Sequence, residues 1–242
     1  MLECRHVFKK FDGKMVVKDC NFSVQKGEMI GLMGESGSGK STLAKLLIGL
    51  EKPSQGQVLL DGQPYSVKKS GVRILLVFQD SLHSVNPHFT VEQVLTEALS
   101  KDVARDEIEA ILEDVGLDKS YLNQPARQLS GGQLQRICIA RGLLLKPDVL
   151  IFDEALSGLD PIVQGRLLRL LYDLWEKYRL TYLFISHDFK LSYALCHRIL
   201  VMADGEIVDE IRKAGKQEQT WRTLNGHVPV LRSLDFVLEA MQ

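Results

Sequence analysis

Cysteine is scarce in this 242-residue sequence, which has only four, and long apolar runs are absent. Cys4, Cys20, Cys138 and Cys196 are scattered without metal-ligand spacing, so we expect free thiols in a reducing cytoplasm. Stretches such as ILLVF and VLIF are far too short to span a bilayer, and the N-terminus does not have the shape of a signal peptide. These absences argue against a disulfide-built or membrane-spanning chain.

Net charge is also nearly absent. Lys and Arg number 30 against 31 Asp and Glu, so the sequence offers no electrostatic case for binding nucleic acid. No internal repeats or low-complexity tracts are visible. The length suits one large α/β domain with a sizeable core and room for a subdomain.

Short apolar strands alternate with helices along most of the chain. Near the N-terminus, ECRHVF and MVVKDCNFSV predict two strands joined at the hairpin dipeptide Asp12-Gly13, and therefore an antiparallel β subdomain. Helical periodicity predicts helices over residues 104–115, ending at Gly116, and 162–178. Strands are predicted in EMIGLMG, VRILLVF, DVLIFDE, TYLFIS and the closing hairpin RILVMADGEIVDE. This alternation predicts an α/β fold with a mostly parallel sheet.

The middle of the chain has helical patterns but no apolar strands. We therefore expect a helical subdomain at 80–145 inserted into a core formed by 1–79 and 146–212, followed by a short tail at 213–242.

GESGSGKS, residues 34–41, matches the P-loop pattern, with a strand before it and a helix after it. The glycines let the backbone wrap phosphates, the Lys40 ammonium reaches the β- and γ-phosphates, and the Ser41 hydroxyl can bind Mg²⁺. The predicted nucleotide-binding residues here are Gly34, Glu35, Ser36, Gly37, Ser38, Gly39, Lys40, Ser41 and Thr42.

Two further strand ends carry polar groups suited to phosphate chemistry. Asp153 and Glu154 end the strand VLIFDE, where one carboxylate could hold the Mg²⁺ hydration shell and the other could polarise a water molecule. His187 directly follows TYLFIS. A lone histidine at a strand end fits either a structural role or a contact with a γ-phosphate.

The segment LSGGQ, residues 129–133, predicts a second helix entrance suited to an anion. Ser130 can cap the helix, while Gly131, Gly132 and Gln133 leave backbone N–H groups facing outward. A simple N-cap, worth about 1 kcal/mol, would explain Ser130. It gives no reason for two consecutive glycines, which are poor helix formers.

The P-loop, LSGGQ, VLIFDE, SGLD and a strand-end SHD occur in this order, and together they resemble the nucleotide-binding domain of ABC transporters over residues 2–210. The resemblance implies a P-loop NTPase core. It also implies that Gln79 is the Q-loop glutamine, Asp160 lies in the D-loop and His187 is the switch histidine. Phe11 falls where the family stacks an aromatic ring on adenine.

The resemblance implies ATP and Mg²⁺ as cofactors, with the metal held through Ser41, Gln79 and Asp153. Glu154 would activate the attacking water, and His187 would stabilise the transferring γ-phosphoryl group. In this family two such domains bind head to tail. Each LSGGQ helix, here the one that begins with Ser130, Gly131, Gly132 and Gln133, then covers the ATP held by the partner.

The implied partners are therefore a second, non-identical ABC ATPase, two transmembrane permease subunits and, indirectly, an extracytoplasmic substrate-binding protein. The implied location is the cytoplasmic face of a bacterial membrane. Nucleic acid is not among the expected partners.

The segment QDSLHSVNPHFTV, residues 79–91, resembles the Q-loop extension of the oligopeptide, dipeptide and nickel importer ATPases. Asn86-Pro87 predicts a turn and Thr90 a helix cap. The tail lacks the Cys-containing extension of many peptide-importer ATPases. Nickel or other metal chelates and peptides therefore both remain candidate cargoes.

The alternative is a soluble ABC ATPase without a transport role. A repair-type protein would need a long coiled-coil insertion before LSGGQ, and no sustained heptads occur there. A translation factor would carry two cassettes, whereas this chain has one P-loop. A regulatory cassette that does not hydrolyse ATP is disfavoured by the presence of both Glu154 and His187.

Overall fold

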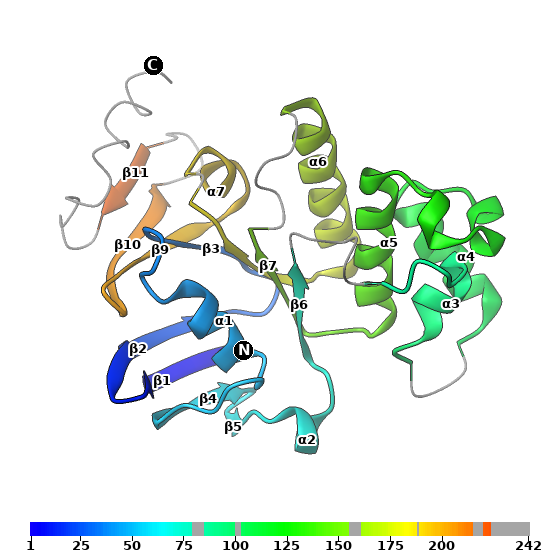
Figure 1. Cartoon of the computed structure of the whole chain (residues 1–242). Coiled ribbons are helices and arrows are strands. Elements are labelled where there is room, and N and C mark those ends of the chain that lie inside the picture. Colours follow the sequence, from blue (N-terminus) through cyan, green and yellow to red (C-terminus); the bar gives the residue numbers. More distant parts are fainter. Residues whose placement is uncertain (79–84, 100–102, 155–160, 188, 215–219, 224–242) are drawn as a thin grey trace. The chain divides into compact units, whose positions relative to one another are not determined.

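A computed structural model of the chain describes residues 1–78, 85–99, 103–154, 161–187, 189–214 and 220–223 (Figure 1). The chain divides into two compact units. Unit 1 consists of Met1–Gly71 and Thr181–Gln242, and unit 2 consists of Val72–Leu180.

The N-terminal part of unit 1 is an antiparallel sheet, as the sequence predicts. Strands β1 (Leu2–Phe11) and β2 (Lys14–Val24) form a hairpin that turns at Asp12-Gly13. On its other side β1 pairs with β4 (Gln55–Leu60), which continues into the short strand β5 (Gln63–Pro64). The strand order is β2-β1-β4-β5.

The second sheet of unit 1 is centred on β3 (Met29–Met33), whose five residues are all buried. Two strands pair with β3 in parallel, β8 (Thr181–Ile185) on one side and β9 (Arg198–Ala203) on the other. The antiparallel strands β10 (Glu206–Ala214) and β11 (Thr220–Thr223) extend the β9 side. Strand β11 was not predicted from the sequence.

The described residues of unit 1 form three helices. Helix α1 (Lys40–Leu47) begins where the P-loop ends and buries Leu43, Ala44, Leu46 and Leu47. The others are α2 (Val67–Ser70) and α7 (Phe189–Leu195).

Unit 2 contains a pair of parallel strands. Strand β6 (Ile74–Phe78) runs beside β7 (Val149–Asp153) from the pair Ile74–Val149 to the pair Phe78–Asp153. The described residues between these strands contain helices but no β-strand. The helices described in this unit are α3 (Val91–Thr96), α4 (Arg105–Asp114), α5 (Gly131–Leu144) and α6 (Pro161–Tyr178), with 3₁₀ turns at Lys119–Asn123 and Ala126–Gln128. The boundaries of the helical subdomain, 80–145, remain a prediction.

The start of α3 in unit 2 follows the local signals in the sequence. Thr90 caps α3 by accepting from the Gln93 N–H (3.2 Å), while the Gln93 side chain accepts from the Thr90 N–H (2.9 Å). Before it, the Phe89 N–H donates to the Asn86 carbonyl (3.1 Å), which forms the predicted Asn86-Pro87 turn.

All four cysteines are buried free thiols, as expected from their spacing. Burial raises the pKa of the Cys20 thiol to about 12, so it stays protonated at neutral pH. None of the described helices has both the length and the apolar character needed to cross a bilayer.

Candidate functional site

The P-loop of unit 1 contains two glycines that tolerate no side chain. A Cβ on Gly34 would lie 2.1 Å from the Met202 carbonyl oxygen, and one on Gly39 would lie 2.9 Å from the Val16 carbonyl oxygen. Gly39 also has φ of +107°, a conformation that L side chains rarely adopt. The loop therefore lies directly against β9 and β2, and glycine is needed for this close approach.

Lys40 places its ammonium group inside this loop. Its Nζ donates to the carbonyl oxygens of Gly34 and Glu35, both at 2.7 Å, and the residue is only 7 % exposed. Because the loop carbonyls orient the ammonium, the loop holds a fixed positive charge. No acidic residue lies in the first turn of α1 to offset its N-terminal dipole, so the loop and helix together favour an anion.

The two residues that follow Lys40 lie in the first turn of α1. Ser41 is exposed and Thr42 is half-buried, so the Ser41 hydroxyl is accessible at the helix entrance.

His187 lies at the same sheet edge as the P-loop. Strands β3 and β8 are parallel, with Leu32 paired to Ile185, and the Ser186 N–H donates to the Leu32 carbonyl (3.3 Å). The carboxyl end of β3 leads into the P-loop, and that of β8 leads to the exposed His187. Tertiary structure thus brings together two predicted site regions that are about 150 residues apart.

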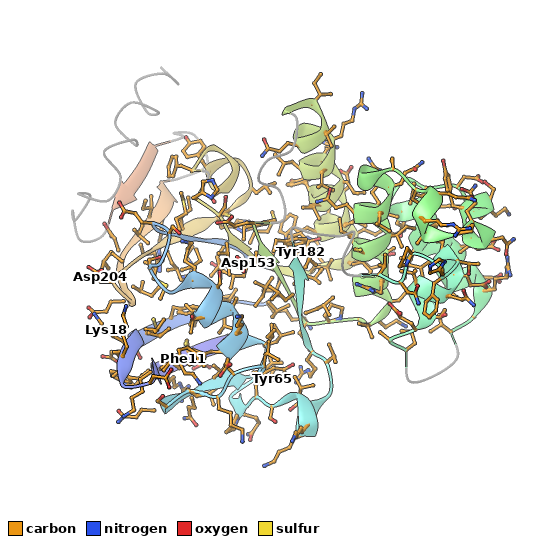
Figure 2. The ribbon with its side chains drawn as sticks, in the orientation of Figure 1. Phe11, Lys18, Tyr65, Asp153, Tyr182 and Asp204 are labelled. Atoms are coloured by element: carbon orange, nitrogen blue, oxygen red, sulfur yellow. The ribbon has the colours of Figure 1, made fainter. Side chains whose placement is uncertain are left out.

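Phe11 lies at the tip of the β1–β2 hairpin and is 40 % exposed (Figure 2). The Lys9 ammonium lies 4.7 Å from the centroid of its ring and also pairs with Glu51 at 2.8 Å. The exposed ring area provides a surface on which a flat base can stack.

Unit 2 carries the two carboxylates predicted at the end of β7. Asp153 pairs with Phe78 across the strands, and both Asp153 and Glu154 are half-buried. Glu154 has φ of +50°, and a left-handed conformation costs a non-glycine residue roughly 1–2 kcal/mol. Such a conformation persists only where the surrounding structure imposes it.

Helix α5 begins with a complete capping box. The Ser130 hydroxyl accepts from the Gln133 N–H (3.3 Å), and the Gln133 side-chain oxygen accepts from the Ser130 N–H (2.8 Å). Gln133 Nε2 also donates to the Tyr121 hydroxyl (2.9 Å). Gly131 and Gly132 are exposed, and a Cβ on either would meet nothing within 4 Å. The side chains of Ser130 and Gln133 therefore form the cap. In contrast, no packing contact within the described structure requires glycine at positions 131 and 132.

Two predicted residues, Gln79 and Asp160, lie outside the described residues. In the opposite direction, sequence reasoning missed Met202 and Gly205, which contact the P-loop from the β9–β10 hairpin. Their sequence signal was an ordinary Asp-Gly turn, which predicts a hairpin but not its neighbours.

Several known proteins are similar to this chain. Residues 17–157 match the family model described as ABC transporter. The chain is 42 % identical over 212 residues to the nickel import ATP-binding protein NikE of Shigella dysenteriae, an alignment covering 83 % of this chain and 79 % of that protein.

Two solved structures have a similar fold. CbiO1 from Clostridium perfringens, part of the ABC transporter complex cbiONQ, has a TM-score of 0.79 and 28 % identity, covering 86 % of this chain and 87 % of its own. The ATP-binding cassette MJ0796, solved as a dimer in a post-hydrolysis state with ADP and Pi, has a TM-score of 0.73 and 27 % identity, covering 89 % of this chain and all of its own. The chain is therefore an ATPase and a member of the ABC transporter family.

Proposed function

We propose that this chain is the ATPase subunit of a nickel importer, which couples ATP binding and hydrolysis to uptake through separate membrane permeases. The observation that carries the ATPase function is the buried Lys40 ammonium, held between the Gly34 and Glu35 carbonyls. The choice of nickel is supported by the 42 % identity to a nickel import ATP-binding protein over most of both chains.

The P-loop is the proposed site for the ATP phosphates, with Lys40 and the backbone N–H groups of residues 34–42 as donors. Phe11 would stack on adenine. The mouth of the site lies at the carboxyl edge of β3, where parallel α/β sheets commonly bind nucleotides.

The residues proposed to hold Mg²⁺ match its preferences. The Ser41 hydroxyl, the Gln79 amide oxygen and the Asp153 carboxylate are hard oxygen donors, the type that Mg²⁺ selects. When bound, this ion neutralises phosphate charge.

The chemical step is proposed to depend on Glu154 and His187. The Glu154 carboxylate would accept a proton from the attacking water, and His187 would donate a hydrogen bond to the γ-phosphate. The accessible His187 at the P-loop edge and the left-handed backbone at Glu154 support these roles.

We further propose that the chain pairs head to tail with a second, non-identical ABC ATPase. Ser130, Gly131, Gly132 and Gln133 would then cover the partner's ATP, with Asp160 near the interface. The dimeric state of MJ0796 and the open space around the two glycines support this assembly. Two permeases and an extracytoplasmic binding protein would complete the transporter, with the chain on the cytoplasmic membrane face.

The permease contact is proposed near Gln79, the residue after β6. Strand β6 and helix α5 enclose an apolar cavity of about 180 Å³. It is lined by Leu75, Leu76, Val77, Ala98, Cys138, Arg141, Gly142 and Leu145. A surface of this kind could receive an apolar side chain from a permease loop.

Gly132→Ala tests the head-to-tail role, because its effects on stability and on turnover should have opposite signs. The added methyl meets no atom within 4 Å, and alanine favours a helix over glycine by up to about 1 kcal/mol. The isolated chain should therefore melt at the same or a slightly higher temperature. ATP turnover of the assembled transporter should nonetheless fall at least tenfold, because the methyl would face the partner's nucleotide.

Gly165→Ala in α6 is the matched control, since that glycine is also helical, exposed and without neighbours within 4 Å. It should raise stability similarly and leave turnover unchanged. Unchanged turnover in Gly132→Ala as well would mean that these glycines do not face a partner's nucleotide.

Deleting the gene tests the cargo. The deletion strain should lose high-affinity uptake of radioactive nickel and the activity of nickel-dependent enzymes, and added nickel salt should restore the latter. Normal nickel uptake combined with resistance to toxic peptides would instead identify a peptide importer.

A further inference from the structure

One residue of the β9–β10 turn connects two regions of the proposed nucleotide site. The Gly205 N–H donates to the Ser38 carbonyl oxygen of the P-loop (3.0 Å), and the Gly205 carbonyl oxygen accepts from the Lys18 N–H of β2 (2.8 Å). Figure 2 shows Lys18 and Asp204, the neighbour of Gly205, at the same end of unit 1. Gly205 thus donates its N–H to the phosphate loop and accepts with its C=O from the β1–β2 hairpin.

The same turn is closely packed against both regions. A Cβ on Gly205, which has φ of +88°, would lie 2.6 Å from the Val16 carbonyl oxygen and 3.4 Å from Lys18 Cγ. The preceding strand places Met202 against the P-loop, where its carbonyl oxygen would meet a Cβ on Gly34 at 2.1 Å and its Cε would meet one on Gly39 at 2.9 Å. Since the shortest of these approaches are to the backbone oxygens of Val16 and Met202, the turn has little freedom to move independently of the loop or the hairpin.

The β1–β2 hairpin also carries Phe11. Lys9 pairs with Val17 of β2 and Phe11 with Lys14, so the hairpin tip continues directly from the part of β2 that Gly205 holds. Fixing residues 16–18 relative to Ser38 therefore fixes the distance from the phosphate loop to the aromatic ring.

We infer that Gly205 is a positioning residue that holds the base-stacking hairpin at a fixed spacing from the P-loop, so that the base and the phosphates of one ATP bind together. This inference rests on the proposed function, because it takes Phe11 as the base-binding residue. Gly205 itself contacts no reacting atom in this arrangement. Because Gly205 holds the P-loop and the hairpin in place beforehand, ATP binding does not have to supply the free energy of ordering these two elements.

The test compares ATP with inorganic triphosphate, which has no base, in competition against a fluorescent ATP analogue. The three atoms nearest to a Cβ on Gly205 all belong to β2, so Gly205→Ala should displace the hairpin and spare the P-loop. ATP affinity should fall roughly tenfold, which corresponds to one net hydrogen bond and its packing, whereas triphosphate affinity should change less than about twofold.

Two variants separate contact from backbone strain. Gly62→Ala is the matched control, because Gly62 has φ of +74° and a Cβ there would meet nothing within 4 Å. It should preserve the wild-type ratio of the two affinities. Gly205→Asn keeps the Cβ contact, but asparagine adopts the left-handed conformation more readily, so it should fold better than Gly205→Ala and still lose the preference for ATP.

The outcomes are distinct when melting temperatures are measured alongside affinities. The inference is overturned if both Gly205 variants keep the wild-type ratio of ATP affinity to triphosphate affinity. It is also overturned if Gly205→Asn keeps this ratio while Gly205→Ala loses it. It is also overturned if both fail to fold while Gly62→Ala folds, because Gly205 would then be purely structural. A wild-type protein that binds triphosphate as tightly as ATP would instead contradict the proposed base site at Phe11.

Discussion

Glu154→Gln should leave ATP binding intact and reduce ATP turnover by roughly 10²-fold or more, the usual effect of removing a general base. Glutamine has the same size as glutamate but cannot accept a proton from water at neutral pH. The substitution should preserve the half-buried position and the left-handed backbone at the end of β7. The measurement is steady-state turnover in the assembled transporter, together with ATP affinity by equilibrium binding.

Glu113→Gln provides the matched control, since Glu113 is an exposed carboxylate on α4 of the same unit and should be neutral. A second variant, Glu154→Gly, should be inactive yet no less stable, because glycine adopts the left-handed conformation without the cost that glutamate bears. Turnover of Glu154→Gln within a few-fold of wild type would remove Glu154 from the proposed role.

Lys40→Ala should weaken ATP binding about 100-fold or more, and turnover should become undetectable as a consequence. The Gly34 and Glu35 carbonyls hold the ammonium inside the P-loop. Because the ammonium is already oriented, little conformational entropy is lost when the phosphates bind. A charged hydrogen bond is worth about 1.5–3 kcal/mol, and 2.8 kcal/mol corresponds to a factor of about 100 in affinity. Direct titration with ATP would measure this loss.

Lys45→Ala is the control for Lys40→Ala, because Lys45 is an exposed lysine in the last turn of the same helix. It removes one positive charge from α1 without touching the loop, and ATP affinity should stay within about twofold. If Lys40→Ala also bound ATP within a few-fold of wild type, the phosphates would have to bind elsewhere.

Short-range features were predictable because each depends on residues close together in the chain. The capping boxes at Thr90 and Ser130 need a polar side chain and its partner three residues later. The Asp12-Gly13 and Asp204-Gly205 turns need only residues that accept positive φ, as both pairs do. The buried strands β3, β7 and β8 were visible as apolar runs, because a strand covered on both faces has no polar alternation.

The order of strands was not predictable from such patterns. Apolar runs predict a mostly parallel sheet, but not that β3 lies between β8 and β9, since many orders satisfy the same composition. That order decides which strand ends meet. It brings His187 to the edge from which the P-loop starts, and it puts Met202 against Gly34.

The sequence by itself therefore determined which chemical groups this ATPase carries and the local conformations that present them. Motif spacing, caps and turns are set by interactions within a few residues. Only the tertiary structure decided how the groups are held: Lys40 between loop carbonyls, Glu154 in a left-handed conformation after β7, and Gly205 between the P-loop and β2. The physical reason is that these contacts depend on the close packing of backbones far apart in sequence, which no local pattern encodes.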